Sequence, residues 1–388
     1  MRKIAVFTGT RAEYGLLSWV IQDLQDSDDV ELQLLVGGMH LSPEFGMTVS
    51  QIEADGIPIA ERLEFVLSSD TSVGMSKSMG LATISAAEAF ARQRPDLLVL
   101  LGDRYEAIAI ALAAMSARIP IAHIHGGEST QGLIDEAIRH AVTKLSHLHF
   151  TATDAYRRRV VQLGEDPSRV FNVGAPGVDG ARRLALLDLP ALRDDLGFDL
   201  RPPYVLATYH PVTLSPDGAV DGLRRLLRAL AEQPNHQVVM TYPNSDAGGR
   251  RIIPLLERFR DTHPGRVLLA KSLGQLRYLS LMQHAAAVVG NSSSGLIEAP
   301  AFGVPTLDIG ERQRGRIAGP TVVRVPDDEA SIRRGIAQVL DPTFAAMCTS
   351  AASPYGGGDA SRQIVEILVS HRLDDLLEKS FYDIEVNL

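Results

Sequence analysis

Cysteine is nearly absent from this sequence. Its 388 residues contain a single one, Cys348, so no internal disulfide can form and no CxxC pair offers a zinc site. A chain with so little cysteine is typical of a reducing compartment, and we therefore expect it in the cytoplasm.

Long apolar runs are also missing. The longest, residues 107–115, is far shorter than the ~20 residues of a membrane-spanning helix. The apolar stretch near the amino terminus is too short for a secretory signal and soon meets Arg11. We expect a soluble protein without membrane contacts. The helix predicted over 107–117 is apolar on all sides, which favours a position between two layers.

Positive charge is in deficit, since 38 Lys and Arg residues face 47 Asp and Glu residues, a net charge of −9. This balance disfavours nucleic acid as a partner and requires any phosphate site to be local. The remaining composition, 45% hydrophobic and 22% charged, is that of an ordinary globular protein. The length favours two domains over one.

Short apolar runs alternate with helical stretches along most of the chain, a pattern typical of βαβ units around parallel sheets. The proline-rich stretch between Gly174 and Pro203 is the expected linker. We expect one domain in residues 1–175, completed by the C-terminal segment 361–388 with a helix over 361–377, and another in residues 200–360. The predicted strands are 3–8, 31–36, 96–101, 119–124 and 148–152 in the first domain, and 204–209, 237–242, 267–270, 286–290 and 306–309 in the second.

Ligands of open parallel sheets bind beyond the carboxyl ends of the strands, and polar residues follow the first predicted strand. A dinucleotide-binding turn at this place would have the pattern G-x-G-x-x-G. Here Gly9 is followed by Thr10 and Arg11, so the pattern is absent, which argues against a dehydrogenase. Arg11 at the start of a helix suits a phosphate or carboxylate. The alternative is a surface cap in which Glu13 complements the helix dipole.

Acidic residues and histidines gather after the next two strands of the first domain. An Asp at the end of a buried strand is either salt-bridged to the following Arg or held as a working carboxylate. Two histidines stand two residues apart at the end of a strand, and we expect only one of them to line the cleft directly, which weakens a two-His metal site. The group is predicted to be an acid/base cluster, the alternative being a solvated cap network. Its members are His123, His125 and Glu128, with Asp135, Glu136, Arg139 and His140 at the start of the following helix, and Asp103 and Arg104 follow the preceding strand.

The second domain offers residues suited to a nucleotide. A His ends its first strand as a candidate acid or phosphate partner, or as a structural residue. Three serines after Gly290-Asn291, at the start of a helix predicted over 295–302, supply hydroxyls and N–H groups for a diphosphate, and a Glu farther on can accept from ribose hydroxyls. The candidates are His210, Asn244, Asp246, Ser292, Ser293, Ser294, Glu298 and Arg312.

Together these motifs resemble the UDP-N-acetylglucosamine 2-epimerases, specifically the hydrolysing branch that feeds sialic-acid-type and legionaminic acid synthesis. The resemblance implies an α/β GT-B fold, in which two Rossmann-like doubly wound domains face a central cleft. It also implies that UDP-N-acetylglucosamine and water give N-acetylmannosamine and UDP, by elimination to a glycal and then hydration. The carriers are Thr8-Gly-Thr-Arg-Ala-Glu-Tyr-Gly15, Gly102-Asp-Arg-Tyr-Glu106, His123-Ile-His-Gly-Gly-Glu128, Ile138-Arg-His140 with Thr143-Lys144, Tyr209-His-Pro211, Gly290-Asn-Ser-Ser-Ser-Gly-Leu-Ile-Glu-Ala-Pro300 and Arg312-Gln-Arg-Gly-Arg316.

This reaction assigns expected roles. Asp103, Glu128 and Asp135 would transfer protons, with His125 as a helper and His210 directed toward the diphosphate. The reaction calls for no metal, nicotinamide or flavin, and we expect a homo-oligomer, a dimer or tetramer. The residues expected to hold the UDP-sugar are Arg11, Arg104, His210, Asn244, Asp246, Ser292, Ser293, Ser294, Glu298 and Arg312.

Two other functions fit the same motifs, and a third is disfavoured by them. An epimerase of the same branch could act on UDP-2,4-diacetamido-2,4,6-trideoxyglucose, from which these motifs do not separate UDP-N-acetylglucosamine. A GT-B glycosyltransferase would share the fold and the UDP site but would need an acceptor. A nucleotide-sugar sensor would need the UDP site without the acidic cluster of the first domain.

Overall fold

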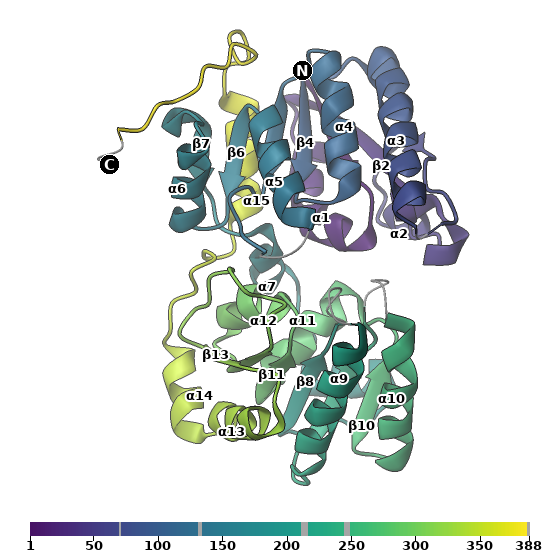
Figure 1. Cartoon of the computed structure of the whole chain (residues 1–388), viewed down its shortest axis with the longest axis vertical. Coiled ribbons are helices and arrows are strands. Elements are labelled where there is room, and N and C mark those ends of the chain that lie inside the picture. Colours follow the sequence, from purple (N-terminus) through teal and green to yellow (C-terminus); the bar gives the residue numbers. More distant parts are fainter. Residues whose placement is uncertain (70, 131–133, 211–215, 244–248, 386–388) are drawn as a thin grey trace. The chain divides into compact units, whose positions relative to one another are not determined.

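The computed structural model describes residues 1–69, 71–130, 134–210, 216–243 and 249–385. The chain divides into two compact units (Figure 1). The first contains Met1–Asp179 and Asp359–Leu388, and the second contains Gly180–Gly358. The chain passes between them inside the proline-rich stretch, which forms the short elements η4 (Pro176–Val178), α7 (Asp179–Arg183) and α8 (Leu189–Leu196).

The first unit is built on seven strands in the order β3-β2-β1-β4-β5-β6-β7, and every pair is parallel. The five strands predicted here are confirmed, whereas β3 and β7 at the edges were not predicted. Neither edge strand is a continuous apolar run, because β3 contains Glu61 and Arg62 and β7 has three residues. The strands are β1 (Arg2–Thr8), β2 (Val30–Gly37), β3 (Ile59–Leu63), β4 (Leu97–Leu101), β5 (Ile121–Ile124), β6 (Leu148–Thr151) and β7 (Val170–Asn172).

Helices cover both faces of this sheet (Figure 1). Successive side chains of a strand point to opposite faces, so Ile4 and Val6 join a core with α1 and α15, while Ala5 and Phe7 join a core with α3, α4 and α5. The helical elements are α1 (Arg11–Gln25), η1 (Gly38–Leu41), η2 (Pro43–Phe45), α2 (Val49–Ala54), α3 (Ser72–Gln93), α4 (Tyr105–Ser116), α5 (Ile134–Leu145), α6 (Asp154–Gln162), η3 (Pro167–Arg169) and α15 (Ala360–Ser370).

Two expectations for these helices need correction. The all-apolar helix α4 is not fully enclosed, because Leu112 and Met115 on its outer side are exposed. The last helix does not extend to Leu377 but ends at Ser370. Beyond it, backbone carbonyls that a helix would satisfy internally accept hydrogen bonds from Arg2 and Arg169 instead.

The second unit repeats the plan with six parallel strands in the order β10-β9-β8-β11-β12-β13. Its five predicted strands are confirmed, and β13 is an additional edge strand. The elements are β8 (Tyr204–Thr208), α9 (Pro216–Ala231), β9 (Gln237–Thr241), α10 (Gly249–Thr262), β10 (Val267–Ala270), α11 (Gly274–His284), β11 (Ala287–Gly290), α12 (Ser294–Ile297), η5 (Ala299–Phe302), β12 (Thr306–Ile309), β13 (Val322–Val325), α13 (Glu329–Val339) and α14 (Pro342–Thr349).

The helix predicted over 295–302 is wrong as a single element. The α-helix α12 ends at Ile297, and the 3-10 turn η5 follows. Pro300 cannot donate to the carbonyl of Leu296, four residues earlier, and its ring crowds that carbonyl. The α-helical hydrogen-bond pattern therefore stops after one turn.

Each sheet reverses its winding between two neighbouring strands, β1 and β4 in the first unit and β8 and β11 in the second. Such switch points are where open α/β sheets bind ligands. The order of strands confirms two Rossmann-like doubly wound units. It also brings together, within each unit, two of the polar segments that the sequence singles out. In the part of the chain described above, no helix is both long and apolar enough to cross a membrane.

Candidate active site

The loop between β1 and α1 is held by a reciprocal cap. Thr10 Oγ1 accepts a hydrogen bond from the Glu13 N–H at 3.3 Å, and Glu13 Oε2 accepts from the N–H groups of Gly9 and Thr10 at 2.8 and 3.0 Å. Burial, followed by the nearby carboxylate of Glu106, raises the pKa of Glu13 to about 7. Glu13 is therefore part of the loop's framework, while Arg11 lies exposed at the start of α1.

In the loop after β4, the adjacent residues Asp103 and Arg104 have different ion-pair partners. Arg104 pairs with the buried carboxylate of Glu106, Nε to Oε2 at 3.2 Å. Asp103 instead accepts a hydrogen bond from Nε of Arg139 on α5 at 2.9 Å. The predicted salt bridge between Asp103 and Arg104 is therefore not observed.

Arg139 is the centre of the polar cluster in the first unit, and it is 1% exposed. Its Nη1 donates to the Glu128 carbonyl at 3.0 Å and to Glu136 Oε2 at 2.8 Å. Its Nη2 donates to Thr130 Oγ1 at 2.8 Å and also to Asp103. One buried guanidinium thus fixes the segment after β4, the segment after β5 and the first turn of α5 relative to one another.

Glu136 shares in this cluster, as predicted, although no catalytic or binding role was assigned to it. Burial would raise the pKa of Glu136, but hydrogen bonds from the Thr130 N–H, Ser129 and Arg139 outweigh it and lower the pKa to about 2. The predicted Asp135 is its neighbour and is half-buried in the same turn. Glu136 and Arg139 are three residues apart on α5, a spacing that suits the observed ion pair.

His125 and Glu128 form a pair. His125 Nδ1 lies 2.6 Å from Glu128 Oε1, and both side chains are nearly buried. The backbone of His125 is left-handed, with φ of +67°, a conformation that is uncommon outside glycine. Among the described residues, the other ring nitrogen, Nε2, is buried without a hydrogen-bond partner.

His123 lies inside β5, whereas His125 follows the last residue of that strand with a left-handed backbone, so the two imidazoles have different partners although residues two apart on a strand share a face. His123 Nε2 lies 2.8 Å from the Gly102 carbonyl and its Nδ1 lies 3.1 Å from Thr143 Oγ1. Burial lowers the pKa of His123 to about 3. It is therefore a neutral residue that fixes the turn before Asp103.

In the second unit, Asn291 joins the ends of β8 and β11 and is 1% exposed. Its Oδ1 accepts from the His210 N–H at 2.7 Å, and its Nδ2 donates to the His210 carbonyl at 2.8 Å. Its own carbonyl accepts from Arg312 Nη1 at 3.0 Å and Gln313 Nε2 at 2.9 Å. Burial, and then Arg312, lowers the pKa of His210 to about 3, so its imidazole is neutral at pH 7.

The serine segment after Asn291 is arranged differently from a simple helix cap. Ser293 is the first boundary residue of α12 and makes no side-chain capping bond. The hydroxyls of Ser292 and Ser294 lie 3.0 Å apart, and Ser294 contacts the Tyr278 hydroxyl at 2.7 Å. Glu298 follows the last residue of this four-residue helix, so it does not stand one turn inside a longer one.

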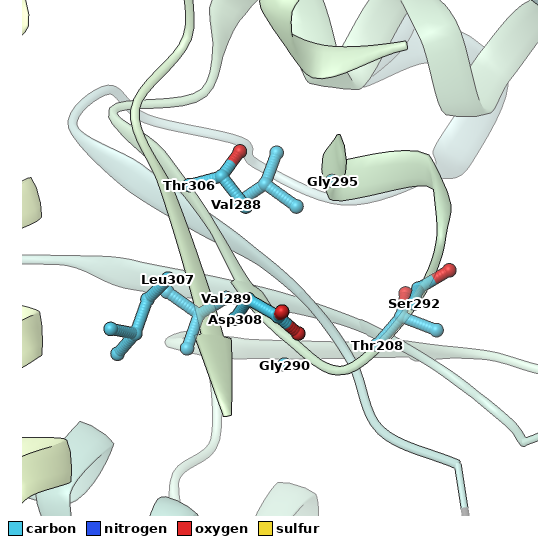
Figure 2. Close-up of a pocket in the computed structure, with 9 residues that line it drawn as sticks. All are labelled: Thr208, Val288, Val289, Gly290, Ser292, Gly295, Thr306, Leu307 and Asp308. Carbon is cyan, nitrogen blue, oxygen red and sulfur yellow. The ribbon is translucent and has the colours of Figure 1, made fainter. Parts of the chain in front are cut away.

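A small depression lies at the carboxyl ends of β8, β11 and β12 (Figure 2). Gly290 has φ of +140°, and a Cβ there would lie 1.9 Å from the Thr208 carbonyl, so only glycine allows this approach. The depression contains 190 Å³ of empty space, open solvent included, below the ~300 Å³ at which ligand pockets begin. This depression lies beside Ser292 and is too small to enclose a nucleotide by itself. Its lining is Thr208, Val288, Val289, Gly290, Ser292, Gly295, Thr306, Leu307 and Asp308.

Within each unit, the predicted residues come together in part. Asp103 and Glu128 are joined through Arg139, and Glu128 is joined to His125. Asn291 joins His210 and Arg312. Asn244 and Asp246 lie outside the described residues.

Comparisons with known proteins agree with this picture. The family model of UDP-N-acetylglucosamine 2-epimerase matches residues 22–369. The chain is 38% identical over 322 residues to the "GDP/UDP-N,N'-diacetylbacillosamine 2-epimerase (hydrolyzing)" of Campylobacter jejuni, covering 83% of this chain and 84% of that protein. It is 36% identical over 388 residues to the "Polysialic acid biosynthesis protein P7" of Escherichia coli, covering 99% and 98%.

The fold is also that of a solved structure. The crystal structure of UDP-GlcNAc 2-epimerase from Neisseria meningitidis bound to UDP-GlcNAc matches with a TM-score of 0.82 and 21% identity, over 96% of this chain and all of that one. This likeness bears on the fold alone, whereas the sequence matches bear on the family. The chain therefore has a GT-B fold and belongs to the UDP-N-acetylglucosamine 2-epimerase family, as an enzyme of its hydrolysing branch.

Proposed function

We propose that this enzyme hydrolyses a UDP-linked 2-acetamido sugar with inversion at C2, releasing UDP and the free epimeric sugar. The observation that carries the proposal is the buried cluster around Arg139, which gathers Asp103 and the His125–Glu128 pair at the carboxyl ends of β4 and β5. Epimerisation at a poorly acidic carbon requires positioned proton-transfer groups, and this cluster supplies them. The names of the related proteins support the same reaction class.

The chemistry divides into two steps. In the elimination, a base removes the C2 proton, the C–H electrons form a C1=C2 double bond, and the bond from C1 to the UDP oxygen breaks. In the hydration, a water oxygen bonds to C1 and gives up a proton to a base, while the C1=C2 electrons take a proton from an acid at C2 on the opposite face. A stabilised leaving group and two groups able to exchange protons are therefore required.

We assign proton exchange to the His125–Glu128 pair and to Asp103. Nε2 of His125 is buried, and a proton taken up there is balanced by Glu128 accepting the proton on Nδ1, 2.6 Å away. Both hydrogen bonds from Arg139 to Asp103 reach Oδ2, which leaves Oδ1 for the substrate. Asp135, in the first turn of α5, is the third carboxylate of this proposal.

Residues of the second unit are proposed to hold UDP. His210, neutral at pH 7, can donate a hydrogen bond to a diphosphate oxygen, and Arg312 supplies positive charge. The hydroxyls of Ser292, Ser293 and Ser294, the carboxylate of Glu298, and Asn244 and Asp246 complete the proposed set. In the first unit, Arg104 is engaged by Glu106 and Arg11 is the exposed cation, so Arg11 is the stronger candidate for a phosphate.

For the sugar, our first candidate is UDP-N,N'-diacetylbacillosamine, because the relative of 38% identity carries that substrate in its name. UDP-N-acetylglucosamine is the second, because the family is described by it. The two differ at C4 and C6, where an acetamido and a methyl group replace two oxygen-bearing groups. Either product is a free N-acetylated sugar suited to sialic-acid-type synthesis. We place the reaction in the cytoplasm, in keeping with the single buried Cys348.

The test is to incubate the full-length protein with each UDP-sugar in D2O and to follow the products by NMR. Release of UDP, with solvent deuterium at C2 of a free epimeric sugar, is the expected result. Retention of the original C2 hydrogen would exclude elimination and hydration. A glycosyltransferase would leave the UDP-sugar largely intact until an acceptor is added. The sugar turned over with the higher kcat/KM decides between the two candidates.

A further inference from the structure

Two buried carboxylates lie at the switch point of the first unit, where the segments after β1 and β4 meet. Glu13 is 6% exposed and Glu106 is fully buried. A Cβ added to Gly9 would lie 3.3 Å from Glu13 Oε2 and 3.5 Å from Glu106 Cγ, so both side chains pack against the same glycine. The proposed proton-transfer steps use neither of these buried acids.

Arg104 is paired with one of the two carboxylates. Its guanidinium donates to both oxygens of Glu106, from Nε to Oε2 at 3.2 Å and from Nη2 to Oε1 at 3.4 Å. Glu13 instead accepts hydrogen bonds from the backbone N–H groups of Gly9 and Thr10. With both carboxylates ionised, the group would carry an excess negative charge, and burial penalises such a charge unless it is paired or takes up a proton.

Three other titratable side chains near Glu13 add no buried positive charge. His40, on η1, contacts the hydroxyl of the last residue of β1 at 3.0 Å, and burial lowers its pKa to about 4, so it is neutral at pH 7. Burial, and then Glu106, raises the pKa of Tyr105, which is therefore a neutral phenol. Arg11, on the same helix as Glu13, is exposed to water, which screens its charge. A proton on Glu13 therefore balances the group, in keeping with its pKa of about 7.

We propose that Glu13 links substrate binding to proton uptake: it takes up a proton from solvent when the diphosphate of the UDP-sugar binds, and gives it up when UDP leaves. This inference rests on the proposed function, in which Arg11, two residues before Glu13, contacts a phosphate. Both backbone hydrogen bonds to Glu13 reach Oε2, so a proton on Oε1 leaves the cap of the loop intact. Glu13 acts through the loop that presents Arg11 and is a positioning residue.

The direction of this linkage follows from charge. A diphosphate brings at least two negative charges, which disfavour the ionised form of a nearby carboxyl group and raise its pKa. Two unit charges ~15 Å away raise that pKa by about 1 at an effective dielectric constant of about 30. Because linkage is reciprocal, UDP binds more tightly to the enzyme whose Glu13 carries a proton. The affinity for UDP should therefore fall as the pH rises above 7.

The first experiment counts the protons taken up when UDP binds to the native full-length protein. Calorimetry is run at pH 8 in buffers of different ionisation enthalpy, and the slope of the binding enthalpy against that enthalpy gives the number of protons. The wild-type protein should take up about 0.4 of a proton per UDP, as expected when a pKa rises from about 7 to about 8. Asp308, whose pKa is raised to about 6 by burial, stays ionised at this pH, as does the terminal phosphate of UDP.

Glu13→Gln is the variant that tests the assignment. Its side-chain oxygen can accept the same two backbone hydrogen bonds, so it resembles the protonated carboxyl group but cannot titrate. It should take up less than about 0.1 of a proton in the same titration. Glu366→Gln, at an exposed position on α15, is the matched control and should keep the wild-type uptake. A wild-type protein that binds UDP without proton uptake, or a folded Glu13→Gln with the full uptake, would overturn the inference.

The second experiment follows the dissociation constant of UDP between pH 7 and 8.5. The affinity of the wild-type protein should fall about four-fold over this range, and that of Glu13→Gln should stay nearly constant. At pH 8.5 the variant should bind UDP about 5- to 10-fold more tightly than the wild type. Damage to the loop alone would weaken binding at every pH, so this gain separates proton linkage from a purely structural role. Parallel pH profiles would contradict the linkage, whereas failure of both proteins to bind UDP would contradict the proposed function on which it rests.

Discussion

The two units have the same winding order and the same position of the switch point, yet they place different groups there. At this edge of the first unit, a buried guanidinium, Arg139, contacts two carboxylates. In the second, a buried amide, Asn291, binds backbone groups, and the histidine that it fixes is neutral. Fold alone therefore does not set the chemistry of this edge. In the function we propose, the first unit moves protons and the second binds the anion.

The environment separates the carboxylates of the first unit into different states. Burial raises the pKa of Glu13 to about 7, while hydrogen bonds lower the pKa of Glu136 to about 2 despite its burial. Groups of one chemical type are thus pushed apart, a condition under which one can hold a proton while another stays charged. Glu13 lies in the loop framework after β1, and Glu136 lies in the cluster after β5.

The largest loss of stability is expected at Arg139, the buried cation that has no counterpart among the described residues at the switch point of the second unit. Arg139→Met leaves Asp103 and Glu136 without their cation, and unpairing buried charges costs about 3–5 kcal/mol. Their side chains are 23% and 29% exposed, so partial hydration favours the lower end, about 3 kcal/mol. Urea unfolding measures this loss. Arg333→Met removes an exposed cation that pairs with Glu232 and should cost less than about 1 kcal/mol. Equal stabilities for the two variants would show that Arg139 does not organise the cluster.

A second variant separates proton transfer from nucleotide binding. Glu128→Gln keeps a hydrogen-bonding group beside His125 but cannot accept its proton. We expect kcat to fall about 100-fold or more, with UDP affinity unchanged within about two-fold, as measured by steady-state kinetics and calorimetry. Glu366→Gln, at an exposed position on α15, is the control and should alter neither. A parallel loss of UDP affinity and turnover in folded Glu128→Gln would place this residue in nucleotide binding instead.

A variant of the second unit should weaken nucleotide binding with little effect on proton transfer. Asn291→Ala removes both hydrogen bonds between the Asn291 amide and the His210 backbone. Since net contributions are about 1 kcal/mol each, we expect UDP affinity to fall about 10- to 30-fold by calorimetry. At saturating substrate, kcat should change much less than in Glu128→Gln. An unaltered UDP affinity would separate this junction from the nucleotide site.

The sequence predicts the central strands of both sheets and the edge strand β10, because these strands are mostly apolar. It does not predict the edge strands β3, β7 and β13, which are short or carry charges such as Glu61 and Arg324. The same limit applies to the site. Asp103 and Glu128 could be predicted because they directly follow strands. Their connection through Arg139 depends on which elements the fold brings together, and the motif gives no sign of it.

The smallest expected effect is on the pH dependence of stability, and it comes from the buried histidines that both units contain. Burial lowers the pKa of both His123 and His210 to about 3, whereas an unfolded histidine titrates near 6.5. Between these values the unfolded state binds a proton that the folded state does not. Stability from each histidine is therefore complete above about pH 6.5 and falls by about 1.4 kcal/mol per pH unit below it.

His123→Gln keeps a donor for the Gly102 carbonyl but does not titrate. Between pH 7 and 5.5, its free energy of unfolding should therefore fall by about 1 kcal/mol less than that of the wild-type protein, measured by urea titration at each pH.

Glu13→Gln should change the pH dependence of stability in the opposite direction. The raised pKa of Glu13 makes its contribution greatest at low pH and lost as the pH rises from about 4.5 to about 7. Removing that carboxylate should make stability rise more steeply with pH over this range. If both variants kept the wild-type slope, the two buried groups would not be the source of the pH dependence of the first unit.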